Sequence, residues 1–209
     1  MKKRKGKKRA SLGAGLLLVA GYLLFGGNTD VDHLIDRVKS VVGVSGKVQT
    51  TENTDIDQYR VGDKVDVELV KHVDGDTTKV KLNGKEYTVR YLLIDTPETK
   101  HPKLGVQPYG KEASSRTKEL LSKGHIQLEF DSGNRTDKYG RLLAYVYADG
   151  VSVQETLLKE GLARVAYVYN KKAMHLNEFE EDEQEAKQRG LNIWSKPGYV
   201  TDKGFNSRN

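Results

Sequence analysis

Acidic and basic side chains gather in three short runs in the middle of the chain. The first run is Asp74-Gly75-Asp76-Thr77, the second extends from Arg90 to Thr99, and the third is Asp137-Lys138-Tyr139-Gly140-Arg141. Carboxylates can hold a hard cation such as Ca²⁺ or Mg²⁺, because both ions prefer oxygen ligands. Guanidinium groups beside them can grip a phosphate with paired hydrogen bonds. A cation and two guanidinium groups around one phosphate are the parts needed to hydrolyse a phosphodiester.

The spacing of these residues predicts a role for each. Asp76 and Asp95 are the predicted cation ligands, since both stand at strand ends of one meander and a hairpin can bring them together. Glu98, three residues further on, is placed to orient or deprotonate an attacking water. Arg90 lies among apolar strand residues and Arg141 follows a turn, so both can clamp the phosphate. Each feature has a structural alternative, because the acids can be turn residues and Arg90 can belong to a buried ion pair.

Three tyrosines accompany this chemistry. Tyr167 and Tyr169 alternate, so an extended chain would direct both rings to one side, and Tyr139 stands in the third run. The rings could stack on a base or hydrogen-bond a phosphate. The structural alternative is that they are amphipathic tyrosines at the rim of a barrel.

The elements that must position these residues are predicted from hydrophobic periodicity. The Asn83-Gly84 pair is a strong hairpin signal, and it joins two strands of a meander. Trp194 is expected to pack the C-terminal residues onto the body. We expect an α+β fold, a five-stranded β-barrel of the oligonucleotide-binding type with about three helices. The predicted barrel strands are 65–73, 77–82, 86–94, 126–130 and 142–148, residues 163–167 are strand-like, and the predicted helices are 109–123, 153–160 and 176–189.

Charge is distributed unevenly along the chain. The net charge is +6, but residues 1–9 hold seven of the 35 basic residues, which leaves 28 basic against 29 acidic residues in the rest. A uniformly basic surface for nucleic acid is therefore not expected. Cysteine is absent, which excludes disulfides and thiolate metal sites. Phosphate affinity must come from local clusters, such as those that include Lys71, Lys100, Lys103, Arg135, Lys138 and Arg141.

The N-terminal region has the sequence pattern of a membrane-targeting segment. Residues 1–9 are predicted to be a basic cytoplasmic tail, and residues 10–29 are uncharged and long enough, as a helix, to span a bilayer core. The positive-inside rule then places the following domain outside the cell, on a membrane anchor. A cleaved signal peptide, which would give a secreted protein, and a soluble cytosolic tail are the alternatives.

The remaining segments follow from composition. Residues 30–62 are predicted to be a stalk or linker, and 31–44 within them have the spacing of a short amphipathic helix, with a weakly ordered stalk as the alternative. Residues 63–195 are the predicted catalytic domain. Residues 196–209 form a C-terminal tail to which the sequence assigns no role.

Several of these runs, in order, resemble the staphylococcal nuclease (thermonuclease) family. The resemblance covers about residues 65–195 and implies an oligonucleotide-binding barrel. It also implies Ca²⁺-dependent endonucleolytic hydrolysis of DNA and RNA, which leaves 3′-phosphate ends. The runs that carry the resemblance are 74–77, 90–99, 135–141, 143–150, 165–169 and 191–195.

The resemblance also implies roles for individual residues. Two carboxylates and one backbone carbonyl would bind Ca²⁺, one acid would act as general base or water-positioner, and two arginines would stabilise the pentacoordinate phosphorus. The implied metal ligands are Asp76, Asp95 and, through its carbonyl, Thr96, and the implied catalytic residues are Glu98, Arg90 and Arg141. The implied substrate-binding residues are Lys138 and Tyr139 for the terminal phosphate and Tyr167 and Tyr169 for the base and sugar.

The expected partners are DNA and RNA substrates, together with a membrane if the N-terminal segment is not cleaved, and the protein is expected to be a monomer. A non-catalytic binding module and a membrane-tethered single-strand-binding protein are the rival functions. All the acids and arginines named above are present, which favours the enzyme. A chelator separates the two classes, because binding alone leaves strand length unchanged.

Overall fold

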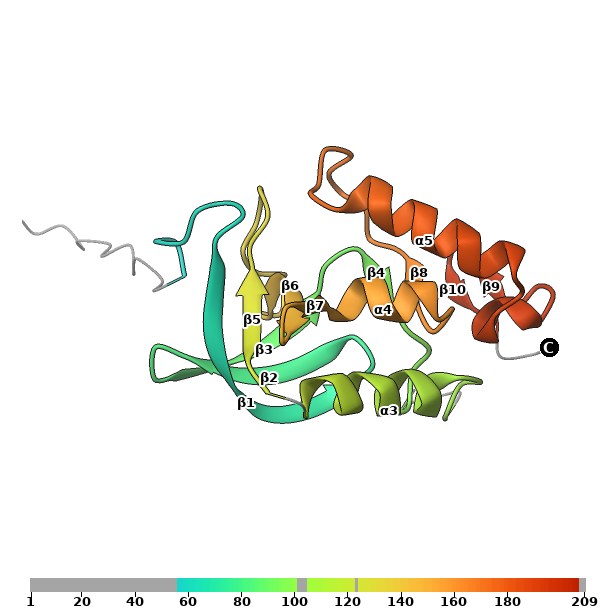
Figure 1. The fold of residues 1–209 in the computed structure, drawn as a ribbon, viewed down its shortest axis with the longest axis horizontal. Coiled ribbons are helices and arrows are strands. Elements are labelled where there is room, and N and C mark those ends of the chain that lie inside the picture. The colour runs from blue at the N-terminus through green and yellow to red at the C-terminus, as the bar shows by residue number, and fades with distance from the viewer. Residues whose placement is uncertain (1–55, 101–104, 123, 207–209) are drawn as a thin grey trace, which may run out of the picture. The chain divides into compact units, whose positions relative to one another are not determined.

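The computed structural model describes residues 56–100, 105–122 and 124–206 (Figure 1). The predicted basic tail (1–9), the membrane or signal segment (10–29) and most of the predicted linker lie outside these residues. None of the helices in the described part of the chain has the length and hydrophobicity of a membrane-spanning segment.

The fold is α+β and is built on a closed five-stranded β-barrel, as the sequence predicted. Strand β1 pairs antiparallel with β2 and with β5, β2 pairs with β3, and β5 pairs with β6. A parallel pairing of β3 with β6 closes the barrel. The barrel strands are β1 (Lys64–Asp74), β2 (Thr77–Leu82), β3 (Lys85–Tyr91), β5 (Ile126–Glu129) and β6 (Leu142–Ala148), and the short β7 (Val151–Ser152) pairs with β6.

Two local features bend the meander into a barrel. The first half of β1 pairs with β5 and the second half with β2, with register irregularities between Leu69 and Lys71 and between His72 and Asp74. Such irregularities increase the twist of a strand and bend it. The predicted hairpin turn at Asn83-Gly84 has φ angles of 50° and 81°, which the paired left-handed positions of a tight hairpin require.

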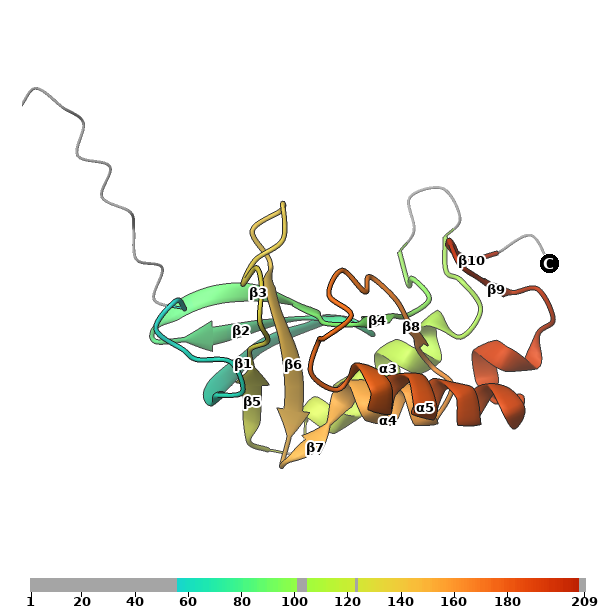
Figure 2. The same cartoon turned by 90° about the horizontal axis from the view of Figure 1, so that it is seen from above.

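Helices cover one side of the barrel (Figures 1 and 2). Helix α4 follows β7 directly, and the Ser152 side chain caps it by accepting the Glu155 amide. It packs against β6, α3 and α5, and α3 packs against β1. The helices within the described residues are α3 (Gly110–Leu121), α4 (Val153–Lys159) and α5 (Leu176–Gln188), followed by one 3₁₀ turn (Asn192–Ser195).

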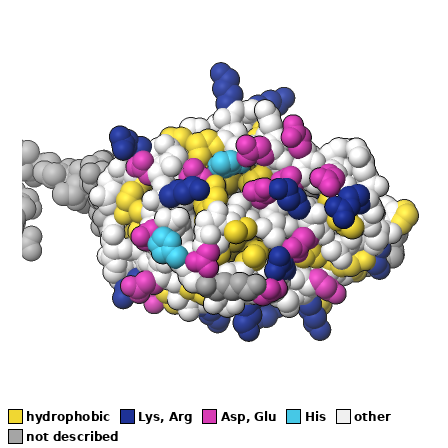
Figure 3. Space-filling view, viewed as in Figure 1, with side chains coloured by type: hydrophobic (Ala, Val, Ile, Leu, Met, Phe, Trp, Pro, Cys, Tyr) yellow, Lys and Arg dark blue, Asp and Glu magenta, His cyan; other side chains and the backbone are white. Residues whose placement is uncertain are grey.

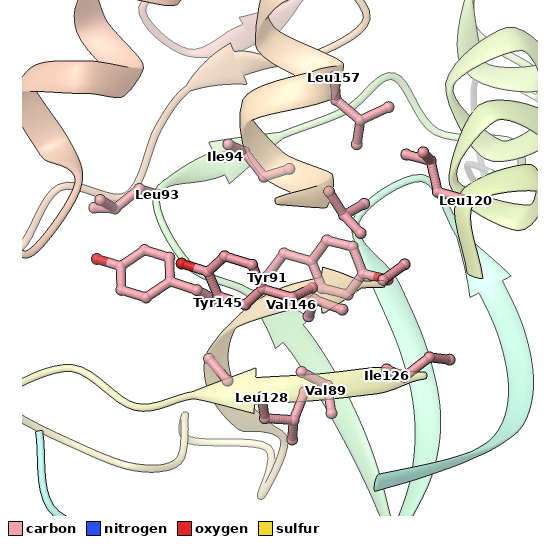
Figure 4. Packing of buried hydrophobic residues seen from close by; sticks show 14 of the residues in the cluster. Val89, Tyr91, Leu93, Ile94, Leu120, Ile126, Leu128, Tyr145, Val146 and Leu157 are labelled. Carbon is pink, nitrogen blue, oxygen red and sulfur yellow. The ribbon is translucent and has the colours of Figure 1, made fainter. Parts of the chain in front are cut away.

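The hydrophobic core lies inside the barrel and under the helices (Figure 4). Tyr91 and Tyr145 are the largest buried side chains at its centre, and Leu157 of α4 and Leu120 of α3 extend it to the helices. The core fixes the barrel as a rigid support for the turns at its rim, where polar residues are concentrated.

The predicted third strand, 86–94, is wrong at its end. Strand β3 stops at Tyr91, and the chain turns through Leu93, whose φ is 63°. Ile94–Asp95 then forms a separate strand, β4, which pairs with β8 (Arg164–Val165). The continuous apolar run concealed this break, because burial alone does not show where a strand changes partner.

The C-terminal residues pack onto the body through Trp194, as predicted, and more fully through Ile193 and Tyr199. Trp194 is only partly buried, with the Lys187 ammonium 4.4 Å from its ring, whereas Ile193 and Tyr199 are fully buried. The Tyr199 hydroxyl donates to the Pro108 carbonyl at 2.6 Å. A hairpin of β9 (Val200–Thr201) and β10 (Gly204–Phe205) follows. The packed body thus extends past residue 195.

Replacing Tyr199 with alanine is expected to lower the free energy of unfolding by about 3–5 kcal/mol, because a fully buried aromatic side chain leaves a cavity. Tyr169→Ala is the matched control, since that side chain is 90% exposed, and its effect should stay within about 0.5 kcal/mol. Denaturant titration of both variants makes the comparison. Equal effects would contradict the packing of the C-terminal residues.

Candidate active site

The meander brings both predicted cation ligands to one guanidinium group. Asp76 stands in the turn between β1 and β2, and Asp95 lies on β4. Arg90, on β3, contacts Asp76 Oδ2 with Nη1 at 3.1 Å and Asp95 Oδ1 with Nη2 at 3.3 Å. Both acids are buried, with exposed fractions of 6% and 8%. The two carboxylates therefore share one cationic partner in a site largely closed to water.

Arg90 also holds the backbone turn that carries Asp95. Its Nη1 donates to the Ile94 carbonyl at 3.1 Å, across the break between β3 and β4. A buried guanidinium is costly unless it is paired, and here it is paired with two acids and donates to the carbonyls of Tyr91 and Ile94. The structural alternative considered for Arg90, a buried ion pair, is thus present, and it lies within the candidate site itself.

Thr96 joins the two acid-bearing loops. Its amide donates to Asp76 Oδ2 at 3.1 Å, while Asp76 Oδ1 accepts the Thr77 hydroxyl at 2.9 Å. A Cβ at Gly75 would lie 2.6 Å from the Thr96 hydroxyl oxygen, so only glycine permits this approach. The Asp-Gly-Asp turn therefore acts as a platform for the loop that begins at Asp95.

The loop that carries Glu98 is fixed through its backbone. The Glu98 amide donates to Gln107 Oε1 at 2.8 Å, and the Gln107 amide returns a bond to the Glu98 carbonyl at 2.9 Å. Asp74 Oδ2 accepts the Thr99 hydroxyl at 2.9 Å. A Cβ at Gly110 would stand 2.7 Å from the Glu98 carbonyl. These contacts hold the main chain and leave the exposed Glu98 side chain available for chemistry.

The electrostatics of the site favour a cation. Burial raises the pKa of the Asp95 carboxyl, and the neighbouring Asp76 raises it further, against the lowering effect of Arg164 and Arg90. Although Glu98 is exposed, the loops beside it remove part of the solvent from its carboxyl group and so raise its pKa, and the charges of Asp76, Asp74 and Asp95 raise this pKa further. Negative charge is therefore concentrated where these loops meet.

The donor set fits a hard divalent cation. Two carboxylates and a backbone carbonyl at Thr96 are oxygen donors of the kind that Ca²⁺ prefers, with water completing the shell. Within ranges 56–100, 105–122 and 124–206, no group of three or more His, Cys, Asp or Glu side chains is arranged to hold a metal. A bound ion would therefore depend on carbonyl and water oxygens as well as on Asp76 and Asp95.

Arg164 is a residue of the site that the sequence reasoning missed. Its Nε and Nη2 bind Asp95 Oδ2 at 3.0 and 2.9 Å, and the residue is 8% exposed. The Phe205 ring lies 5.7 Å from its guanidinium carbon. Asp95 is thus held by one arginine on each oxygen. The available signal was a single arginine within the apolar run 162–166, the same signal that identified Arg90.

Replacing Arg164 with glutamine is expected to lower the free energy of unfolding by about 3–5 kcal/mol, since it leaves one side of a buried carboxylate unpaired. The control is Arg116→Gln, whose partner Glu160 is 36% exposed and whose loss should cost no more than about 1 kcal/mol. Thermal and denaturant unfolding of both variants tests the difference. An Arg164 variant as stable as the control would contradict the buried pairing.

The third sequence run forms a separate turn held by Asp137. The Arg141 guanidinium binds Asp137 Oδ2 at 2.7 Å, and Asp137 Oδ1 accepts the amides of Tyr139 and Arg141 at 2.9 Å each. Tyr139 is 72% exposed, with the Lys138 ammonium 4.9 Å from its ring. Within the described part of the chain, no contact joins Lys138, Tyr139 or Arg141 to Asp76 or Asp95.

The strand register nevertheless places the two predicted phosphate-binding arginines on one side of the sheet. Arg90 of β3 is the partner of Leu143 of β6, and Arg141 precedes Leu143 by two residues. All three residues are partly exposed, while Val89, next to Arg90, and Leu142, between Arg141 and Leu143, are buried, as strand alternation requires. The Cα atoms of the two arginines are then roughly 8 Å apart, from the strand spacing and rise.

The two predicted base-pocket tyrosines differ. Tyr167 adopts a left-handed conformation (φ 56°), and the Tyr169 amide donates to its carbonyl at 3.0 Å, so the chain is not extended and the predicted alternation is wrong. The Tyr167 hydroxyl lies 3.5 Å from Asp95 Oδ1, and its ring is 5.2 Å from the Arg90 guanidinium carbon. Tyr169 is 90% exposed. Only Tyr167 is thus brought against the acid group.

Much of the chain, including part of the candidate site, is similar in sequence to known proteins. Residues 88–196 match the sequence model of a family described as staphylococcal nuclease homologue. Over 142 residues the chain is 68% identical to the SPbeta prophage-derived endonuclease YokF of Bacillus subtilis (strain 168), a match that covers 68% of this chain and 48% of YokF. It is 66% identical over 142 residues to endonuclease YncB of the same organism, covering 68% of this chain and 67% of YncB.

A more distant relative is the thermonuclease of Staphylococcus hyicus, which is 41% identical over 127 residues, 61% of this chain and 74% of that protein. The match spans about half the length of YokF and about two thirds of YncB. The family match of residues 88–196 includes Arg90, Asp95, Glu98 and Arg141, and it begins within β3.

Proposed function

Because the chain belongs to the staphylococcal nuclease homologue family, we propose that it is a Ca²⁺-dependent endonuclease that hydrolyses phosphodiester bonds of DNA and RNA. The observation that carries this proposal is the sharing of Arg90 by Asp76 and Asp95. A buried pair of acids and a guanidinium at one point can receive both a cation and a phosphate. The names of the relatives, endonuclease and thermonuclease, agree with it.

The proposed roles follow the geometry. Asp76, Asp95 and the Thr96 carbonyl would hold Ca²⁺, which when bound would withdraw charge from the phosphate oxygens. Glu98, on a loop fixed by its own backbone, orients a water and accepts its proton. Arg90 and Arg141 approach the phosphate from the β3–β6 face and stabilise the charge that develops on phosphorus.

The bond changes are those of a hydrolysis. The water oxygen forms a bond to phosphorus, the bond from phosphorus to the 5′-oxygen breaks, and the departing 5′-oxygen takes up a proton from solvent. The products carry a 3′-phosphate and a 5′-hydroxyl. We assign Lys138 and Tyr139 to the terminal phosphate of the bound strand, and Tyr167 and Tyr169 to its base and sugar. The exposed Tyr169 would reach the substrate from outside the acid group.

The test is the fate of defined DNA and RNA strands incubated with the full chain in Ca²⁺ or in a chelator. Shortened strands with 3′-phosphate ends are expected in Ca²⁺ only. Strands that keep their length in Ca²⁺, while still binding the protein, would favour the non-catalytic module and contradict the proposal.

The proposed location is the outer face of the cell membrane, with residues 10–29 as the anchor and a cleaved, secreted form as the alternative. The charge pattern of residues 1–29 supports this location. Cell fractionation with N-terminal sequencing tests it. An intact N-terminus in the membrane fraction is expected, and an intact N-terminus in the cytosol would contradict the proposal.

A further inference from the structure

A basic cleft lies beside the loop that carries Glu98. Its volume is about 500 Å³, and it lies between β1, β2 and α3. The lysines come from three separate elements and from the loop after Thr99. Lys and Arg side chains are also visible along the lower edge of the molecule, over β1 and α3 (Figure 3). The lining residues are Lys71, His72, Val73, Lys79, Thr99, Lys100, Lys111, Ser114 and Ser115; this basic cleft is named by them below.

The basic cleft contains four lysines, and no acid is among its lining residues. Over the described residues, none of its four lysines forms an ion pair with a carboxylate, in contrast to Lys159 and Lys187, which lie 3.8 and 3.7 Å from Asp182 and Glu183. The nearby Asp74 accepts bonds from Thr99 and from the Gly75 amide. The lysine charges are therefore free to attract an external anion.

The arrangement of the lysines suits a chain of anions better than a single one. Lys71 and Lys79 are directly opposite each other in the β1–β2 register, and Lys111 projects from the first turn of α3 across the cleft. The hydroxyl of Ser114, 3.3 Å from His72 Nε2, and that of Ser115 add hydrogen-bonding groups on the same wall. All three lysines are exposed, so each side chain can change its conformation to contact a ligand.

The lining of the basic cleft reaches the residue next to Glu98. Thr99, which lines it, is the residue after Glu98 and is bound by Asp74, which precedes the cation ligand Asp76 by two residues. A strand whose scissile phosphate lies at Asp76 and Asp95 can therefore continue past Glu98 into the cleft.

We propose that the basic cleft binds the backbone phosphates of a nucleic-acid strand on one side of the scissile phosphate. This proposal rests on the proposed nuclease function and adds a second, sequence-independent contact region to it. Lysines bind phosphates through charge, so the contact would favour long strands over short ones and would weaken with salt.

The test compares two substrates of the triple variant Lys71→Gln, Lys79→Gln, Lys111→Gln: a long single-stranded polythymidine and a thymidine dinucleotide with one diester. We expect kcat/KM for the polymer to fall on the order of 10-fold or more at low salt. The slope of log(kcat/KM) for the polymer against the logarithm of salt concentration should become less negative by about 2, because three phosphate contacts on a single strand are lost. Cleavage of the dinucleotide should stay at the parental rate.

A matched control removes the same number of charges elsewhere. Lys85, Lys187 and Lys196 are exposed and do not line the basic cleft, so the corresponding triple glutamine variant should keep the parental salt dependence. A gain-of-charge variant, Ser115→Lys, should raise kcat/KM for the polymer. It should also make the slope of log(kcat/KM) against the logarithm of salt concentration more negative by about 0.7. It keeps every residue of the parental cleft except one exposed serine.

The outcomes separate this proposal from the function on which it rests. If the parent cleaves neither substrate in Ca²⁺, the nuclease function fails. If the parent cleaves both and the cleft variant cleaves the polymer with unchanged salt dependence, the cleft proposal alone is overturned. Equal losses on polymer and dinucleotide would also overturn it, because the lysines would then act on the reacting phosphate.

Discussion

Replacing Glu98 with glutamine is expected to reduce kcat for strand cleavage by roughly 10²- to 10⁴-fold, the usual contribution of a general base. The amide has nearly the same shape but cannot accept the proton of the attacking water. The bonds to Gln107 use only the main chain of Glu98, so the loop should keep its conformation. Nucleotide affinity should therefore change little. Steady-state kinetics and calorimetric titration of a nucleotide measure the two quantities.

Glu112→Gln is the control for this substitution. Glu112 is an exposed acid in the first turn of α3, and its replacement should leave kcat at the parental value. A Glu98 variant that cleaves strands at the parental rate would remove Glu98 from the chemistry. Equal losses of turnover and of nucleotide binding would instead assign it to substrate binding.

Replacing Arg90 with lysine is expected to reduce kcat by roughly 10²- to 10³-fold and to destabilise the fold. A lysine retains the charge but cannot contact Asp76, Asp95 and the Ile94 carbonyl together, as the guanidinium does. The partial loss of a buried network should cost about 3 kcal/mol of unfolding free energy. Cleavage kinetics and denaturant unfolding of one preparation measure both effects.

Arg141→Lys separates catalysis from folding. Arg141 is partly exposed, and among the residues that the structure describes its guanidinium forms an ion pair only with Asp137 and lies 5.6 Å from the Tyr139 ring. Its replacement should reduce kcat to a similar degree while the unfolding free energy changes by no more than about 1 kcal/mol. If the Arg90 variant were as stable as the Arg141 variant, the bridging role of Arg90 would be contradicted. If either variant kept the parental kcat, that arginine would have no part in the transition state.

The barrel was predictable because its strands have simple local signals. The alternation of apolar and polar residues located β1 and β2, and the Asn83-Gly84 pair located the turn into β3. Strand β6, Leu142–Ala148, was predicted at its observed bounds. The break at Leu93 was not predictable from periodicity, since β4 is defined by its pairing with β8, about seventy residues further along the chain. Tertiary pairing, rather than local sequence, decides such short strands.

The candidate site also contains some residues that local sequence signals predicted and others that they did not. The grouping of Asp76, Asp95 and Arg90 followed from strand ends and from one charged residue in an apolar strand. Arg164 carried the same signal but stood in a segment whose position depended on the unrecognised β4–β8 pairing. Gln107 gave no signal, because an isolated amide in a loop has no pattern, although it binds the backbone of Glu98.

Calorimetric titration of Ca²⁺ into the full chain, compared with Asp76→Asn and Asp95→Asn, tests the proposed site most directly. Each amide removes one charged oxygen ligand and keeps the side-chain volume, so binding should weaken by roughly 10-fold or more in each variant if a lost charged contact is worth about 1.5–3 kcal/mol. Ca²⁺ affinity that is the same in the parent and in both variants would contradict the assignment of Asp76 and Asp95 as its ligands.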